Sequence, residues 1–184
     1  HGDPSFQELA RVQYDGRIPE WTGITLCPAT GRYLDQYGLG VALMMAPFFL
    51  AAHGVTWLFR YPAMAGDGYH FSYPLDGFSP FYQHAAGLAG LFYLIAGLFV
   101  LKLVLERYFS KGVVLGTLAS LLMGTNLLFY GTVWSVMSHT YSFFLFSCLL
   151  YVIPRWYERP RSVVLSTLFG LIVGLIALVR VPNV

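Results

Sequence analysis

Long stretches without charged side chains dominate the pattern of this chain. Residues 112–154 contain no Lys, Arg, Asp or Glu over 43 positions. A membrane-spanning helix needs about 20 apolar residues, so this stretch has room for two spans. A short polar turn over residues 132–140, which carries His139, separates its two halves, and further uncharged runs cover residues 36–59, 77–101 and 162–179. The pattern predicts an all-α membrane protein.

The apolar runs predict about four transmembrane helices. We place these spans near residues 85–105, 113–131, 140–154 and 163–179. Residues 85–184 are then a four-span bundle, and residues 1–84 are an outer loop. The apolar run near 38–59 contains Pro47 and His53, so it either crosses the membrane or lies along its surface as a juxtamembrane helix. We favour the helix that does not cross.

Composition supports the membrane assignment and excludes several classes of function. The chain is 57% hydrophobic and 11% charged, whereas soluble domains carry about 25% charged residues. No basic patch is interleaved with aromatic residues, so we expect no nucleic-acid partner. No GxGxxG, P-loop, HExxH or GxSxG motif occurs, and no soluble nucleotide site is indicated. Cys27 and Cys148 have no partner at metal-ligand spacing, and we expect no disulfide between them.

The short polar turns predict the orientation in the membrane. Cationic residues gather on the cytoplasmic side of membrane proteins. The turn at 132–139 is uncharged and should face out, which places residues 1–84 outside as well if 38–59 does not cross. Two other turns should be cytoplasmic because they hold six of the eleven cationic residues, namely Lys102, Arg107, Lys111, Arg155, Arg159 and Arg161.

Acidic residues are concentrated before the first clear span. Carboxylates there could hold a divalent cation or act as a general base, or they could simply keep a loop solvated. Asp35 is the best single candidate, because it directly precedes the 38–59 helix. The helix macrodipole offers a plainer reason for an acid at that place. The seven acids of this region are Asp3, Glu8, Asp15, Glu20, Asp35, Asp67 and Asp76.

Three polar residues at helix ends or within spans add to the candidates. His139 at the outer turn could ligate a metal or move a proton, or Ser138 or His139 could cap the next helix. Arg180 after the last span could hold a phosphate through two hydrogen bonds, or extend to lipid headgroups. Asn126, alone in the 113–131 run, is expected to hydrogen-bond to another helix.

The order of elements resembles the amino-terminal part of integral-membrane glycosyltransferases of the GT-C fold. This family uses polyprenyl-phosphate sugars and includes the protein O-mannosyltransferases and the lipid A aminoarabinose transferases. The resemblance implies that the 38–59 helix is part of the first outer loop. It is carried by residues 32–40 leading into 46–49, by 105–110, by 124–130, by 137–139 and by 179–183.

The resemblance implies roles for four residues. The family transfers a sugar from the lipid-linked donor to an acceptor on the outer face, and an acidic pair in the first outer loop supports catalysis. Asp35 matches the second acid, and Asp3 stands in for the first. His139 falls where many relatives carry an acid, so Asp35 and His139 are the candidate ligands of a divalent metal ion. Arg180 matches a basic residue that would bind the donor phosphate.

These implications lead to an expected location and to a rival function. We expect an integral protein of a bacterial inner membrane, in contact with membrane lipid and a polyprenyl-phosphate sugar. The family's first and later spans are missing here, so we interpret the chain as a piece of a larger protein and expect it to be inactive alone. A non-catalytic membrane subunit of a larger complex is the alternative. A transporter is disfavoured, because no ionisable residue lies within a span near its middle.

Overall fold

The computed structural model describes residues 24–35, 38–59, 63–64, 70–71, 73, 75 and 77–180. The chain divides into two compact units, His1–Gly38 and Leu39–Val184, which are treated separately below. The predicted division of the chain at residue 84 stays a prediction. Of the candidate acids, all but Asp35 lie outside the described residues, namely Asp3, Glu8, Asp15, Glu20, Asp67 and Asp76.

The described part of the first unit is a β-hairpin. Strand β1 (Ile24–Cys27) pairs antiparallel with β2 (Arg32–Asp35), with Ile24 opposite Asp35 and Cys27 opposite Arg32. The backbone N–H groups of Thr30 and Gly31 donate to the carbonyl of Cys27, at 3.2 and 2.9 Å. Gly31 has φ 66°, a left-handed conformation that glycine adopts without strain. The sequence predicted only a loop here, so the purely α fold class is wrong in this detail.

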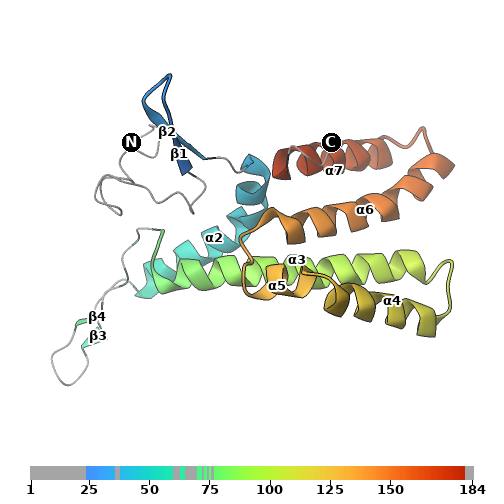
Figure 1. The fold of residues 1–184 in the computed structure, drawn as a ribbon, viewed down its shortest axis with the longest axis horizontal. Coiled ribbons are helices and arrows are strands. Elements are labelled where there is room, and N and C mark those ends of the chain that lie inside the picture. Colours follow the sequence, from blue (N-terminus) through green and yellow to red (C-terminus); the bar gives the residue numbers. More distant parts are fainter. Residues whose placement is uncertain are drawn as a thin grey trace. The chain divides into compact units, whose positions relative to one another are not determined.

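The second unit is mostly helical. Its one described pair of strands, β3 (Ala63–Met64) and β4 (His70–Phe71), forms a short hairpin between the first two helices. Figure 1 shows the helices of this unit in order. They are α2 (Leu39–Phe59), α3 (Pro80–Leu105), α4 (Lys111–Gly124), α5 (Leu127–Thr132), α6 (Ser138–Glu158) and α7 (Val163–Val179).

Two of these helices are long and apolar enough to cross a membrane. By length and composition these are α2 and α3, while α4 and α7 are shorter apolar helices. The helix predicted at 38–59 is therefore present as α2, and the one at 163–179 has the predicted bounds. Four transmembrane helices are not established by length and composition. Helix α2 is long enough to cross the membrane, although from the sequence we favoured a helix that does not cross.

The span predicted at 113–131 is broken into α4 and α5. Thr125 ends α4, and its hydroxyl donates to the carbonyl of Leu121 at 2.7 Å and accepts from the N–H of Leu127 at 3.2 Å. The side chain thus satisfies one of the free N–H groups at the start of α5, as a helix cap does. Asn126 is exposed at this break. The expectation that Asn126 hydrogen-bonds to another helix from within a span is not met.

Helix α3 is the central helix of the second unit, and small residues let its neighbours approach closely. A Cβ on Gly90 of α3 would lie 2.8 Å from the carbonyl oxygen of Ser135 in the turn after α5. A Cβ on Gly97 would lie 3.2 Å from the Cα of Phe144 in α6. Such glycines allow close backbone packing between apolar helices. Helices α6 and α7 then pack as an antiparallel pair beside α3 (Figure 1).

Helix α2 runs obliquely across the ends of α6 and α7 towards the start of α3 (Figure 1). Near its beginning, Gly40 lies against the backbone of Val179 at the end of α7. Further along, the hydroxyl of Tyr93 donates to the carbonyl of Met44 at 2.9 Å. At its end, Phe59 stacks on Phe81 in the first turn of α3. The helix therefore contacts three partners at one end of the bundle.

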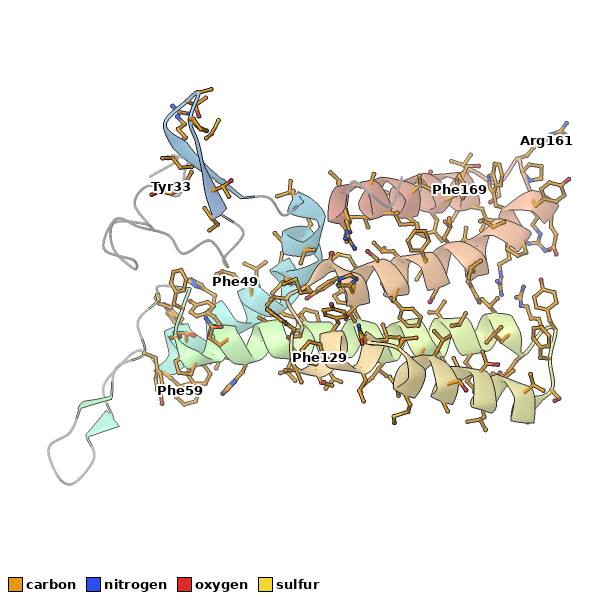
Figure 2. The ribbon with its side chains drawn as sticks, viewed as in Figure 1. Tyr33, Phe49, Phe59, Phe129, Arg161 and Phe169 are labelled. Carbon is orange, nitrogen blue, oxygen red and sulfur yellow. The ribbon has the colours of Figure 1, made fainter. Side chains whose placement is uncertain are left out.

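Aromatic side chains join the second half of α2 to the start of α3. The ring of Phe49 lies 4.8 Å from that of Tyr82, and Figure 2 shows Phe49 and Phe59 on the same stretch of α2. The Tyr82 hydroxyl lies 2.7 Å from Nδ1 of His53. His53 of α2 is thus a partner of an α3 tyrosine. The buried core lies between α2, α6 and α7 and consists of Val41, Met44, Tyr141, Leu145, Val152, Ile172, Ile176 and Val179.

Candidate functional site at the end of the bundle

The candidate site lies where α5, α6 and α7 end or begin, at the end of the bundle opposite the two basic turns. The turn between α5 and α6 is fixed by its own backbone, because the N–H groups of Val133 and Trp134 both donate to the carbonyl of Phe129, at 2.9 and 3.1 Å. The buried Ser135 then rests against Gly90 of α3. This turn delivers the chain to the start of α6, where His139 is the second helical residue.

His139 is half-buried and packs on an aromatic ring. Its imidazole stacks on Tyr130 of α5 with ring centroids 4.2 Å apart and an angle of 27° between the planes. Met137 occupies the helix cap and makes no side-chain capping bond. The plainer interpretation, in which Ser138 or His139 caps α6, is therefore wrong. The packing holds the imidazole at the head of the helix.

His139 lies just before the span predicted at 140–154. Two effects favour its neutral form. Burial lowers the pKa of the imidazole, and the nearby positive charge of Arg180 lowers it further. Both effects disfavour the imidazolium ion. A neutral imidazole at pH 7 can accept a proton or donate a lone pair to a cation. Protonation for anion binding is not favoured here.

Arg180 ends α7 on the same side as His139. Its backbone N–H donates to the carbonyl of Ile176 at 3.3 Å, and its side chain is exposed. Within the described residues it forms no salt bridge. An exposed, unpaired guanidinium at a helix end can bind a phosphate oxygen pair. The structure thus brings together two of the four residues singled out from the sequence.

Two buried hydroxyl groups lie directly after His139. Thr140 and Tyr141 are both fully buried, and within the part of the chain described here neither hydroxyl oxygen has a hydrogen-bond partner. The Tyr141 ring packs on Tyr93 at 5.2 Å. Buried polar groups are generally hydrogen-bonded, so these two hydroxyls are exceptions among the buried side chains. Sequence analysis missed these hydroxyls and the Tyr130–His139 stack, because the residues concerned lie in uncharged, mostly apolar sequence.

Asp35 lies in the other unit, and its setting corrects one expectation. It is the last residue of β2 and precedes the first residue of α2 by four positions. The macrodipole acts mainly within the first turn of a helix, and the first turn of α2 has no acidic residue, so Asp35 is not one of its first-turn acids. Its roles as general base and metal ligand stay predictions. Asp3, the other proposed catalytic acid, lies outside the described residues.

The described residues do not by themselves make a metal site. Over residues 24–35, 38–59 and 77–180, and the short pieces between, no group of three or more His, Cys, Asp or Glu side chains comes together. His139 supplies one nitrogen ligand, and a divalent cation held by oxygen ligands takes six or more. The metal expected at Asp35 and His139 stays a prediction, and no chemical step is derived through it.

An open groove runs along α3 beside the end of α5. It has a volume of about 570 Å³ and is lined by Gln83, His84, Gly87, Leu88 and Leu91 of α3 together with Thr132. The polar residues lie at its α3 N-terminal end and the leucines further along the helix. Phe129, labelled in Figure 2, is an exposed aromatic of the neighbouring helix α5. The groove combines a polar mouth with an apolar wall.

Comparison with protein-family models, curated proteins and solved structures finds no match for this chain. The geometry of the helices and of the end of the bundle therefore carries the functional argument.

Proposed function

We propose that this chain is part of an integral-membrane glycosyltransferase of the GT-C type. It would move a sugar from a polyprenyl-phosphate donor to an acceptor hydroxyl on the outer face of a bacterial inner membrane. The observation that carries the proposal is the placement of His139 and Arg180 at one end of the helix bundle, away from the basic turns. A cation that is free to bind phosphate sits there beside a neutral imidazole and two buried hydroxyls.

The dimensions of the bundle support four membrane crossings. At about 1.5 Å per residue, the 21 residues of α6 extend about 31 Å and the 17 residues of α7 about 26 Å. The hydrocarbon core of a bilayer is about 30 Å thick. Helix α3 is long and apolar enough to cross by itself. Helices α4 and α5 follow one another along α3 (Figure 1) and would together supply the fourth crossing. In this arrangement α2 lies along the outer surface.

The proposed chemistry uses one carboxylate of the first unit and one guanidinium of the second. A carboxylate of the outer loop, Asp35 in the present proposal, would take the proton of the acceptor hydroxyl. The acceptor oxygen forms a bond to the anomeric carbon, and the bond from that carbon to the phosphate oxygen breaks. Arg180 would stabilise the negative charge that develops on the leaving lipid phosphate. The groove along α3 would hold the isoprenyl chain and so orient the donor.

The proposal is tested by sugar transfer from a radiolabelled polyprenyl-phosphate sugar in membranes that contain the full-length protein. Arg180→Gln should lower transfer by about tenfold to a hundredfold, because a guanidinium–phosphate contact contributes about 1.5–3 kcal/mol. Arg161→Gln is the matched control, because it removes the same charge at the opposite end of α7 and should leave transfer unchanged. Equal rates for wild type, Arg180→Gln and an Asp35→Asn/His139→Gln double variant would refute the proposal.

A further inference from the structure

A second cluster of cationic side chains surrounds a cavity at the opposite end of the bundle. The cavity has a volume of about 350 Å³. Arg107 from the turn after α3, and Arg155 and Arg159 from the end of α6, supply its positive charge, while Glu158 supplies one negative charge. The start of α7 also lines the cavity, through Ser162, Val164 and Leu165. Two turns of chain that are distant in sequence, the one after α3 and the one between α6 and α7, therefore meet at one cavity.

One tyrosine holds two of these arginines in place. The guanidinium carbon of Arg155 lies 3.5 Å from the ring centroid of Tyr151, and that of Arg107 lies 5.6 Å from the same centroid. Arg155 also donates through Nη1 to the carbonyl of Tyr151 at 2.7 Å. Cation–π contacts of this kind orient arginine side chains. The two guanidinium groups are thereby gathered at the cavity.

Among the described residues, the positive charge of the cavity is only partly neutralised. In the parts of the chain that the structure describes, Arg107, Arg155 and Arg159 form no salt bridge, while Lys102 pairs with Glu106 at 3.4 Å nearby. Two net positive charges remain after Glu158 is counted. Ser162 caps α7 by accepting from the N–H of Leu165 at 3.4 Å, so the positive end of the α7 dipole also points to this place. Arginine groups and helix N-termini both favour phosphate.

The surroundings of the cavity are those of a lipid headgroup region. Trp156 stacks on Phe169 at 5.0 Å and donates through Nε1 to Ser166 at 3.1 Å; Figure 2 labels Phe169 on α7. Tyr108, Phe109 and Tyr157 are exposed around the same turns. Trp and Tyr gather at the membrane–water interface. From the cavity, α7 continues as an exposed apolar surface that includes Val164, 76% exposed, and Leu171.

We propose that this cavity binds the phosphate headgroup of an anionic membrane phospholipid, with its acyl chains along the exposed apolar surface of α7. Basic pockets between membrane helices on the cytoplasmic side bind such headgroups. The inference rests on the membrane location of the chain and is independent of sugar transfer. Loss of either function would therefore leave the other standing.

Lipid binding by the detergent-purified protein tests this inference. Native mass spectrometry would count adducts of dioleoyl phosphatidylglycerol and of dioleoyl phosphatidylcholine, which has the same tails but no net charge. The wild type should bind phosphatidylglycerol preferentially. An Arg107→Gln/Arg159→Gln variant should bind it about thirtyfold more weakly, since each surface cation contributes about 1 kcal/mol to such binding. Both residues are exposed, and neither takes part in the Arg155–Tyr151 hydrogen bond. The variant should therefore keep its fold, which circular dichroism would check.

The matched control removes two cations from the same end of the bundle but outside the cavity. Lys111→Gln/Arg161→Gln should bind phosphatidylglycerol like the wild type; Figure 2 shows Arg161 at the tip of the α6–α7 turn. Equal losses in the two double variants would overturn the proposal, because they would indicate a general surface charge effect. Displacement of the lipid by millimolar inorganic phosphate would also overturn it and identify a site for soluble phosphate. Equal binding of phosphatidylglycerol and phosphatidylcholine would also overturn the proposal.

Discussion

At the scale of single residues, the end of the bundle opposite the basic turns carries one histidine and one arginine in unlike settings. His139 is held by a tyrosine ring and is half-buried, whereas Arg180 is exposed and unpaired among the described residues. Burial and a neighbouring cation both favour the neutral imidazole. The protein therefore keeps a cation and a neutral base side by side, and protonation of His139 opposes the native state.

This electrostatic setting predicts a pH dependence of stability. The pKa of His139 is lowered in the folded protein, relative to about 6.5 in the unfolded chain. The unfolded state therefore binds more protons between the two pKa values, so stability is full above about pH 6.5 and falls as the pH decreases towards the folded pKa. Thermal unfolding in detergent, measured from pH 5 to 8, should show this loss.

Two variants separate the contribution of His139 from that of other groups. His139→Gln should flatten the decrease below pH 6.5, because glutamine does not titrate. His84→Gln, on the exposed surface of α3, should keep the wild-type pH profile. A profile that stays the same in His139→Gln would show that another group causes the acid sensitivity.

At the scale of the elements, the placement of α2 depends on a close backbone contact. A Cβ on Gly40 would lie 2.7 Å from the Cα of Val179, whereas Gly54 in the same helix has no atom within 4 Å of its Cβ position. Backbone atoms cannot move aside as a flexible side chain does. Helix α2 can therefore reach the end of α7 only with glycine at position 40.

Replacing this glycine should loosen α2 from α7. Gly40→Ala should destabilise the protein by about 1–3 kcal/mol, the usual range for overpacking. Gly54→Ala should be neutral or stabilise by up to about 1 kcal/mol through helix propensity. Thermal unfolding followed by circular dichroism would measure both. A loss that is equal in the two variants would contradict the packing of α2 on α7.

The break between α4 and α5 should depend on the hydroxyl of Thr125. Thr125→Val removes the acceptor for the Leu127 N–H and should cost about 1 kcal/mol, as the loss of a helix cap does. Thr117→Val is the matched control, because Thr117 donates to the carbonyl of Val113 at 2.9 Å without capping a helix. Hydrogen exchange should be faster at Leu127 only in Thr125→Val. Unchanged protection there would exclude the capping role.

At the scale of the whole molecule, apolar runs predicted where helices form but not how they end or pack. The bounds of α7 and the existence of α2 followed from uncharged runs, because both are bordered by polar residues. The α4–α5 break was missed, because Gly124, Thr125 and Asn126 lie within an uncharged run and act through a local hydrogen bond. The hairpin at Ile24–Asp35 was missed because its strands have only four residues each and lie in a segment rich in turn-forming residues.

The candidate site was predicted in its residue types more than in its geometry. His139 and Arg180 were recognisable as polar residues at the ends of apolar runs. Tyr130 and Tyr141 were not recognisable as site residues. The sequence of an apolar helix does not show what an aromatic ring packs on or whether its hydroxyl has a partner. The cavity of Arg107, Arg155 and Arg159 depends on two turns meeting in space, which charge counting alone does not reveal.

In the proposed topology, the basic turns and the His139–Arg180 end face opposite sides of a membrane, and α2 lies along the outer surface. Cysteine labelling with a membrane-impermeant maleimide in right-side-out vesicles tests this claim directly. Native Cys27 reports on the hairpin, and hydrogen bonds from Thr30 lower the pKa of its thiol, which favours the reactive thiolate. Val133→Cys and Arg161→Cys, in a background without native cysteines, report on the two ends of the bundle.

The proposed topology predicts that Cys27 and Val133→Cys react in intact vesicles, and that Arg161→Cys reacts only after the membrane is permeabilised. If Cys27 reacts under the same condition as Arg161→Cys, and Val133→Cys reacts under the other condition, then α2 crosses the membrane. Labelling of Val133→Cys and Arg161→Cys from the same side would contradict the four-crossing bundle, and the glycosyltransferase proposal with it.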